Sequence, residues 1–418
     1  MLHMIIGGAG CGKSTRLMER VQAQVAAGER VITLVPEQFS YEFDQKLYRI
    51  LGPKAFNQLE THSFKSLARS VFQRFGCVPD GRKNADELTR MALLYQAVTA
   101  VSEREKKLRL LGRQCRQTSF LSELSAMFAQ FRRNGIQPEQ LYSSSALLNG
   151  RLQEKMLDLF EIYQKYDQLL AQHHLKDTET DLTEAAVIAN GQDAFLGDVV
   201  CLDEFESFTE DEYAMLDVLL SSCKDVYIAL RIDSTSAAPF SLFETVQGTM
   251  LRLKQLAAKL HISVETERCE TPYRFQSEEL RWLNQHIFRN TLPFTGDAPH
   301  LHILEAQSPE EEANYVCATI RRMLAQDTAL RCRDVAVLSN QMSDYKSILE
   351  TAMERYALPY YMDEKESMCY TPFLVYLHTL LGLLQNTKPD TELLLRLGKT
   401  GMTSCTPEAI AVLENYCY

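Results

Sequence analysis

The chain has 418 residues, of which 45% are hydrophobic and 24% are charged, and its formal net charge at pH 7 is −11. This length exceeds what one hydrophobic core normally supports, so we expect roughly two to four globular domains. The acidic balance argues against a wholly basic nucleic-acid-binding surface, although it permits a local basic groove.

The eleven cysteines are scattered singly, without a C-x-x-C pair. This distribution is typical of proteins in a reducing cytosol and offers no metal-binding spacing. No apolar run reaches the roughly eighteen residues of a membrane helix, and the N-terminus leaves no room for a signal peptide. We therefore expect a cytoplasmic protein without a membrane segment. The helical pattern continues up to the end of the chain, so we also expect it to be the N-terminal part of a longer protein.

A phosphate-binding motif lies close to the N-terminus. It matches the pattern G-x-x-x-x-G-K-S/T and consists of Gly7, Gly8, Ala9, Gly10, Cys11, Gly12, Lys13, Ser14 and Thr15. An apolar strand pattern precedes it, and a helical pattern follows it up to Gly28. The backbone N–H groups of such a loop bind phosphate oxygens, while Lys13 would reach the β- and γ-phosphates and Ser14 would bind Mg²⁺. The alternative is a glycine-rich turn that matches the pattern by chance.

Two further strand patterns follow. Residues 30–35 and 58–62 predict a second and a third strand, and a helical pattern follows the third strand. Because ligands bind at the carboxyl ends of the strands in open α/β sheets, the loop after each strand is a candidate binding segment.

From about residue 84 to residue 190 the apolar residues recur with helical spacing, which predicts an inserted helical subdomain. Its basic residues are Lys106, Lys107, Arg109, Arg113, Arg116, Arg132 and Arg133. Solvated helix faces are the favoured interpretation of these residues, and contact with a DNA backbone is the alternative.

The strand pattern resumes at residues 198–202 and ends in Asp203 and Glu204. Behind a phosphate-binding loop, an acidic residue at a strand tip holds Mg²⁺, so we expect Asp203 to share the ion with Ser14. Glu204 could orient or deprotonate the attacking water. Residues 226–231 predict another strand.

A second strand–helix series begins after Pro299. We expect strands at residues 301–304 and 334–338 and helices at residues 310–324 and 345–356, an alternation that is typical of a parallel sheet. The architecture would then be two α/β domains with a helical insertion.

This order of elements resembles that of superfamily-one DNA helicases of the UvrD/RecB type. More closely, it resembles the N-terminal region of the AddB/RexB family, the B subunits of bacterial ATP-dependent helicase/deoxyribonucleases that process double-strand breaks. The matching segments are Gly7–Thr15, Val35–Phe39, Thr61–Phe64 with Leu67 and Ala68, Asp203–Phe205 with Phe208 and Thr209, Leu242 and Phe243, Arg274 and Phe275, Glu311–Ala313, Arg333–Leu338 and Pro359–Tyr361.

The resemblance implies an α/β fold, a P-loop NTPase with two RecA-like parallel-sheet domains and a helical insertion. The first RecA-like domain would comprise residues 1–83 and 191–275, and the inserted helical subdomain residues 84–190. Residues 276–368 would begin the second RecA-like domain, and residues 369–418 would begin a further helical insertion.

The resemblance also implies site residues. The segments that contact single-stranded DNA in this superfamily correspond to Gln38, Ser40, His62, Ser63 and Phe64. Phe64 could stack on a base, and a core phenylalanine is the alternative. Arg274 matches an arginine that reaches the γ-phosphate in the transition state, and a surface arginine before a helix is the alternative.

Three features of active helicases in this superfamily are missing. There is no glutamine motif before the phosphate-binding loop, Phe205–Ser207 replaces an x-Gln-Asp segment, and Arg231–Thr235 replaces a Gly-Asp-x-x-Gln segment. Because these features couple the γ-phosphate to domain closure and DNA stepping, we expect a site that binds ATP but drives translocation poorly or not at all.

The resemblance implies ATP and Mg²⁺ as cofactors, single-stranded DNA and duplex ends as substrates, and a heterodimer with an AddA/RexA-like A subunit that supplies the motor. This chain would grip the other strand and scan for a recombination hotspot. The family's nuclease domain, with its cysteine-held iron–sulfur cluster, would lie beyond Tyr418. An autonomous helicase, a catalytically silent scaffold for DNA and partner, and a P-loop kinase remain as alternatives.

Overall fold

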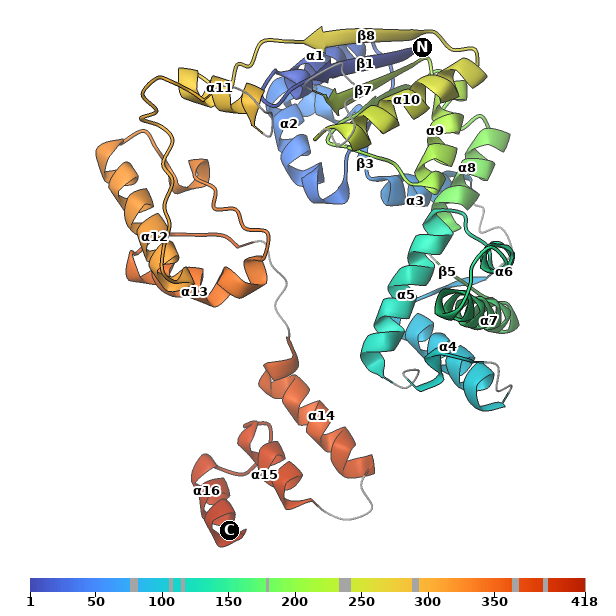
Figure 1. The fold of residues 1–418 in the computed structure, drawn as a ribbon, viewed down its shortest axis with the longest axis vertical. Helices are drawn as coiled ribbons and strands as arrows, with labels where there is room; N and C mark the ends of the chain where they lie inside the picture. Colours follow the sequence, from blue (N-terminus) through green and yellow to red (C-terminus); the bar gives the residue numbers. More distant parts are fainter. Residues whose placement is uncertain are drawn as a thin grey trace. The chain divides into compact units, whose positions relative to one another are not determined.

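The structure is a computed structural model that describes residues 1–75, 82–104, 108–113, 117–177, 180–232, 242–287, 293–362, 368–385 and 390–417. The chain divides into two compact units, residues 1–301 and residues 302–418 (Figure 1). No helix in the described ranges is both long enough and apolar enough to cross a membrane.

The first unit is organised around a six-stranded sheet in which every neighbouring pair of strands is parallel. In spatial order, the strands are β3 (Leu59–His62), β2 (Val31–Leu34), β6 (Val199–Leu202), β7 (Asp225–Arg231), β1 (Leu2–Gly7) and β8 (Val264–Cys269). All residues of β2 and β6 are buried. Such continuous apolar runs suit strands that are covered on both faces, and the five strands predicted from the sequence in this unit are confirmed.

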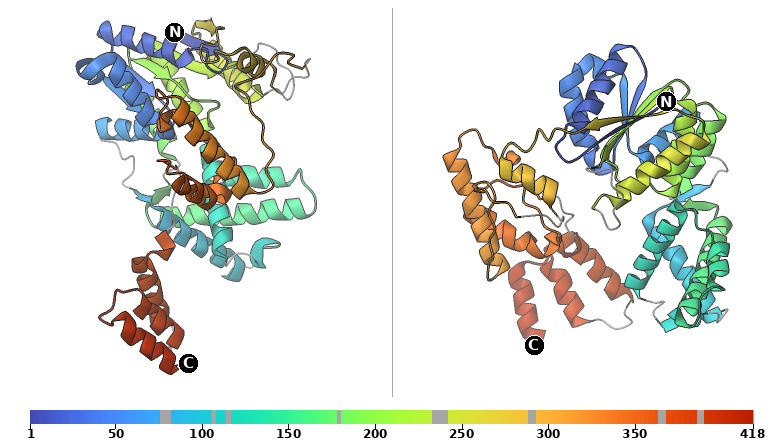
Figure 2. Two further views of the ribbon diagram at one scale, coloured as in Figure 1. Left: turned by 90° about the vertical axis from the view of Figure 1, so that its left-hand side faces the viewer. Right: turned by 45° about the horizontal axis from the view of Figure 1, so that its top comes forward.

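Helices cover both faces of this sheet (Figure 2). On one face, Ile5, Val31 and Cys201 pack with α1 (Lys13–Ala26) and α2 (Ser40–Phe56). The alternate residues of the same strands, among them Ile6 and Ile32, belong to a second core. The helices of that second core are α3 (Phe64–Phe75), α8 (Asp181–Gly191), α9 (Glu210–Ser222) and α10 (Glu244–Lys259). The alternation follows from the two-residue period of a strand.

A helical insertion with its own core interrupts the sheet. It contains α4 (Glu87–Thr99), α5 (Thr118–Arg133), α6 (Pro138–Ser145) and α7 (Arg151–Gln172), packed around buried residues that include Phe128, Tyr163 and Tyr166. The short parallel pair β4 (Lys83–Ala85) and β5 (Leu175–Asp177) flanks these helices. Helix α8, which we expected in the insertion, instead packs in the core of the sheet through Ala185 and Ala189. Its small apolar residues allow close approach to α3 and α9.

The basic residues of the insertion divide into several environments. Arg132 is largely buried, its guanidinium lies 5.5–5.6 Å from the rings of Tyr163 and Tyr166, and it forms an ion pair with Asp167. It therefore stabilises the helical core rather than a solvated face. Arg109 is exposed. Outside the described residues lie Lys106, Lys107 and Arg116, and outside the described side chains lies that of Arg113.

Strand β8 was not predicted from the sequence. It reads Val-Glu-Thr-Glu-Arg-Cys and is largely exposed, so it lacks the apolar pattern of a buried strand. Its six residues pair in parallel with the six residues of β1. This pairing brings the segment after Cys269 to the carboxyl edge of the sheet, beside the phosphate-binding motif. Helix α11 (Glu278–His286) follows this segment.

The second unit is helical in its described part. Helices α12 (Pro309–Gln326) and α13 (Met342–Arg355) share a small core, and α14 (Pro372–Gln385), α15 (Thr391–Lys399) and α16 (Pro407–Cys417) follow. The strands predicted at residues 301–304 and 334–338 are not formed: no ladder joins either segment to described residues, and Ile303 and Leu338 are 94% and 90% exposed. A strand needs a hydrogen-bonded neighbour, which an apolar run cannot supply by itself.

Candidate nucleotide-binding site

The candidate site lies at the carboxyl edge of the six-stranded sheet. Because all six strands are parallel, the segments that follow them share this edge. The phosphate-binding loop follows β1, Asp203 follows β6, Arg231 ends β7, and Tyr273 and Arg274 come shortly after β8. The tertiary structure thus gathers residues from four strands.

Three glycines shape the loop between β1 and α1. Gly10 and Gly12 have φ angles of 71° and 80°, which side chains rarely adopt. A Cβ atom on Gly7 would lie 2.5 Å from the carbonyl oxygen of Cys269, so only glycine lets β8 approach here. Gly12 precedes α1, whose first turn holds no acidic residue and whose N-terminus has no side-chain cap. The first amides of α1 are therefore available to an anion.

Lys13 begins α1 and folds back over the loop. Its Nζ atom donates a hydrogen bond of 2.6 Å to the carbonyl oxygen of Gly8. Burial lowers the pKa of this ammonium group, while the charge of Asp203 opposes the shift. A half-buried cation held by one neutral carbonyl is well placed to exchange that contact for a phosphate oxygen.

The remaining loop residues have structural roles. The Cys11 side chain is buried, and its Sγ atom lies 3.9 Å from the carbonyl oxygens of Ala9 and Glu270. Thr15 is exposed in the first turn of α1, next to the half-buried Ser14.

Asp203 provides a buried carboxylate next to Ser14. It is 4% exposed, its Oδ1 atom accepts a 2.9 Å hydrogen bond from the amide of Glu204, and its Oδ2 atom has no hydrogen-bond partner among the described residues. Burial raises the pKa of this carboxyl to about 6, against the lowering effect of a hydrogen bond from Ser14. An orphaned carboxylate oxygen next to a hydroxyl group fits a hard cation such as Mg²⁺. Phosphate and water oxygens would complete the coordination.

Glu204 follows Asp203 and is exposed. Its φ angle is 64°, in the left-handed region that a glutamate seldom adopts. Strained backbone of this kind concentrates at functional sites. The structure thus places an exposed carboxylate directly after the candidate cation ligand.

Tyr273 and Arg274 cover the phosphate-binding loop. The amide of Arg274 donates a 3.3 Å hydrogen bond to the carbonyl oxygen of Gly10, and a Cβ atom on Gly10 would lie 2.5 Å from the Cβ atom of Arg274. The ring of Tyr273 would lie 3.6 Å from a Cβ atom on Gly12, and the residue is 71% exposed. Arg274 is therefore beside the loop, as a nucleotide contact requires. We did not single out Tyr273 from the sequence, and its signal was its place immediately before Arg274.

The candidate DNA-binding residues after β2 lie at the same edge of the sheet. Gln38 is exposed in a short 3₁₀ helix, Glu37–Phe39. Ser40 begins α2, and its hydroxyl donates a 2.9 Å hydrogen bond to the carbonyl oxygen of Glu37. Of these two side chains, Gln38 is the one that extends into solvent.

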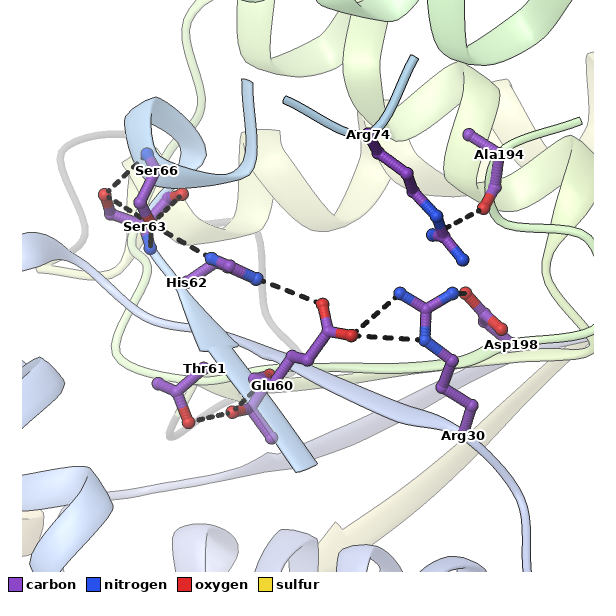
Figure 3. A network of polar contacts seen from close by, with 10 residues as sticks. Arg30, Glu60, Thr61, His62, Ser63, Ser66, Arg74, Ala194 and Asp198 are labelled. Atoms are coloured by element: carbon purple, nitrogen blue, oxygen red, sulfur yellow. Dashed lines mark hydrogen bonds and ion pairs between the residues drawn. The ribbon is translucent and has the colours of Figure 1, made fainter. Parts of the chain in front are cut away.

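The candidates after β3 are held by a polar network (Figure 3). The ring nitrogens of His62 lie 3.3 Å from Glu60 Oε2 and 3.3 Å from the Ser66 hydroxyl. Ser63 and Ser66 exchange hydrogen bonds in the first turn of α3. Glu60 accepts two hydrogen bonds from Arg30. Burial raises the pKa of the Glu60 carboxyl, but the hydrogen bonds from Arg30 and His62 outweigh it, so the pKa lies below its usual value.

Phe64 lies in the core instead of at the surface. It is 4% exposed, and its ring packs edge-on against Phe205 and Phe208 at centroid distances of 5.5 and 6.0 Å. This is the core alternative that the sequence left open, and it corrects the expected stacking of Phe64 on a DNA base. The phenylalanine follows β3 where α3 turns back over the sheet, so its side chain is covered.

Comparisons with known proteins agree with this arrangement. A family model described as "ADDB, N-terminal" matches residues 4–284. Proteins named as the B subunit of an ATP-dependent helicase/deoxyribonuclease are 28% identical in Thermoanaerobacter sp. strain X514 over 426 residues, 25% in Clostridium acetobutylicum over 425 residues, and 27% in Clostridium tetani over 437 residues. Each alignment covers 99% of this chain but only 36–37% of the relative, so the chain spans about a third of their length. The family match covers the whole nucleotide-binding edge, and the chain belongs to the AddB N-terminal family.

Proposed function

We propose that this chain is the ATP-binding, helicase-like part of the B subunit of a heterodimeric helicase/deoxyribonuclease that processes DNA double-strand breaks. Its relatives bear the name of that subunit. The single observation that carries the proposal is the buried Asp203 carboxylate, with an unpartnered oxygen, next to a phosphate-binding loop whose helix lacks a side-chain cap.

The residues of the site would divide the work as follows. Lys13 exchanges the Gly8 carbonyl for phosphate oxygens, and the first amides of α1 bind the same phosphates. Ser14 and Asp203 hold Mg²⁺, which neutralises phosphate charge when it is bound. Glu204 orients or deprotonates the attacking water, and Arg274 stabilises the charge of the γ-phosphate in the transition state. The exposed ring of Tyr273 offers a flat apolar face for the nucleotide base.

We further propose that the site drives translocation weakly or not at all. The support is chemical: the coupling segments of active helicases are replaced by Phe205–Ser207 and by the segment that begins at Arg231. The chain would grip a DNA strand and scan for a hotspot, with Gln38, Ser40, His62 and Ser63 as candidate contacts. An A subunit would supply the motor, and the longer relatives hold the remaining two thirds of the protein.

Nucleotide binding is the first test. We expect Lys13→Ala to weaken the binding of a fluorescent ATP analogue with Mg²⁺ by at least about tenfold, because a charge-assisted contact contributes roughly 1.5–3 kcal/mol. The matched control is Lys254→Ala, which removes an exposed lysine of α10 and should leave the affinity unchanged. Equal affinity of the wild type and Lys13→Ala would refute the proposed site.

A further inference from the structure

Arg231 lies at the nucleotide-binding edge without an assigned role. It is the last residue of β7, the strand between β6 and β1. In the register of the sheet it stands opposite Gly7, and the amide of the next residue, Ile232, donates a 3.1 Å hydrogen bond to the carbonyl oxygen of Gly7. Adjacent strands lie about 5 Å apart, so the Arg231 backbone is one strand spacing from the start of the phosphate-binding loop.

The guanidinium of Arg231 contributes to the electrostatics of the loop. The pKa of Lys13 is lowered first by burial, and the positive charge of Arg231 lowers it further. Two cationic side chains of the same edge therefore repel each other when no anion lies between them. An anion bound at the loop would relieve this repulsion.

The present partner of Arg231 is an anion supplied by the protein. Its guanidinium forms an ion pair with Glu206, in the loop after β6. Both side chains are more than half exposed, at 56% and 57%. Such pairs stabilise proteins little, because solvent competes for both charges. The pair can therefore open at small cost when a more highly charged anion arrives.

We propose that Arg231 is a specificity residue that distinguishes nucleoside triphosphates from diphosphates, by leaving Glu206 and pairing with the terminal phosphate. Glu206 then acts as an internal competitor that occupies the guanidinium in the nucleotide-free state. The inference rests on the proposed nucleotide-binding function and adds a discriminating contact to it. A planar guanidinium can bind a terminal phosphate through two parallel hydrogen bonds, which a diphosphate bound at the same loop does not offer in the same place.

The experiment compares two nucleotides on the whole chain. Dissociation constants are measured by calorimetry for ATPγS and for ADP, both with Mg²⁺, in the wild type, Arg231→Gln, Arg231→Lys, Glu206→Gln and Lys254→Ala. We expect Arg231→Gln to bind ATPγS about tenfold more weakly, which corresponds to about 1.4 kcal/mol, and to bind ADP within twofold of the wild type. Arg231→Lys should keep part of the preference, and Glu206→Gln should bind ATPγS severalfold more tightly than the wild type.

The outcomes separate the inference from the proposed function. If the wild type binds both nucleotides and Arg231→Gln weakens both equally or neither, Arg231 is not a specificity residue, while the nucleotide site stands. If the wild type binds neither nucleotide, the proposed function fails and the inference fails with it. A melting temperature of Arg231→Gln close to that of the wild type shows that its affinities do not reflect unfolding.

Discussion

At the scale of single residues, Asp203 shows how a functional site is kept at the expense of stability. A buried carboxylate with an unpartnered oxygen disfavours its own charged form, and burial raises its pKa to about 6. The folded state therefore binds more protons than the unfolded state between the unfolded pKa of 3.8 and about pH 6. The contribution of Asp203 to stability is complete below that unfolded value and is lost as the pH rises through the folded value.

Replacing Asp203 with asparagine should remove this penalty. We expect Asp203→Asn to raise the free energy of unfolding at pH 7.5 by about 1–3 kcal/mol without nucleotide, and by less at pH 5. The same variant should lose most of the stabilisation that ATP and Mg²⁺ confer on the wild type. Thermal denaturation at both pH values, with and without the ligands, measures these differences.

The control for this prediction is Asp193→Asn, which removes an exposed carboxylate. Asn tolerates the left-handed φ of 47° found there, so the substitution should change stability little. A stability difference between Asp203→Asn and the wild type that is the same at pH 5 and pH 7.5 would contradict the buried-charge explanation.

At the scale of elements, β8 decides what surrounds the phosphate-binding loop. The strand is an exposed edge strand, and its place depends on pairing with β1 rather than on its own apolar content. Without β8, Tyr273 and Arg274 would not lie against Gly10 and Gly12. Close approach at Gly7 is thus a condition for the site.

The Gly7→Ala substitution tests this dependence. The new Cβ atom would lie 2.5 Å from the backbone oxygen of Cys269, so we expect a loss of about 1–3 kcal/mol in the free energy of unfolding. Nucleotide affinity should fall as well, because β8 must shift. Chemical denaturation and nucleotide titration provide the two measurements.

The matched control is Gly248→Ala, in the middle of α10, where an added Cβ atom meets nothing within 4 Å. Alanine favours a helix over glycine, so this variant should be more stable by about 0.5–1 kcal/mol. If Gly7→Ala were as stable as the wild type, β8 would not approach β1 as closely as the structure shows.

At the scale of the whole molecule, the open question is whether the site turns over ATP. Single-strand-DNA-stimulated hydrolysis should be measured in the reconstituted two-subunit complex whose A-subunit motor is inactivated. We expect hydrolysis to be negligible, with the wild type binding nucleotide and Lys13→Ala not binding it, because the coupling segments are missing.

Other results would select the alternatives. Fast hydrolysis that both Lys13→Ala and Glu204→Gln abolish would make this chain a motor and refute the weak-motor proposal. Strong DNA-stimulated hydrolysis without any partner would indicate an autonomous helicase. Unchanged complex stability and DNA handling in Lys13→Ala would favour a silent scaffold.

The sequence by itself determined the parts of this protein that are encoded by local pattern. Buried parallel strands need continuous apolar runs, and a phosphate-binding loop needs glycines at fixed spacing, so β1, β2, β6 and the residues from Gly7 to Ser14 could be recognised without a fold. The pairing of Asp203 with Ser14 could be predicted because both follow parallel strands whose carboxyl ends meet.

Only the tertiary structure decided the features that depend on distant partners. The edge strand β8, the place of α8 in the core of the sheet, the burial of Phe64 against Phe205, and the position of Arg231 opposite Gly7 all result from contacts between segments far apart in the chain. The unformed strands at residues 301–304 and 334–338 show the same dependence, since an apolar run becomes a strand only when a neighbour completes its hydrogen bonds.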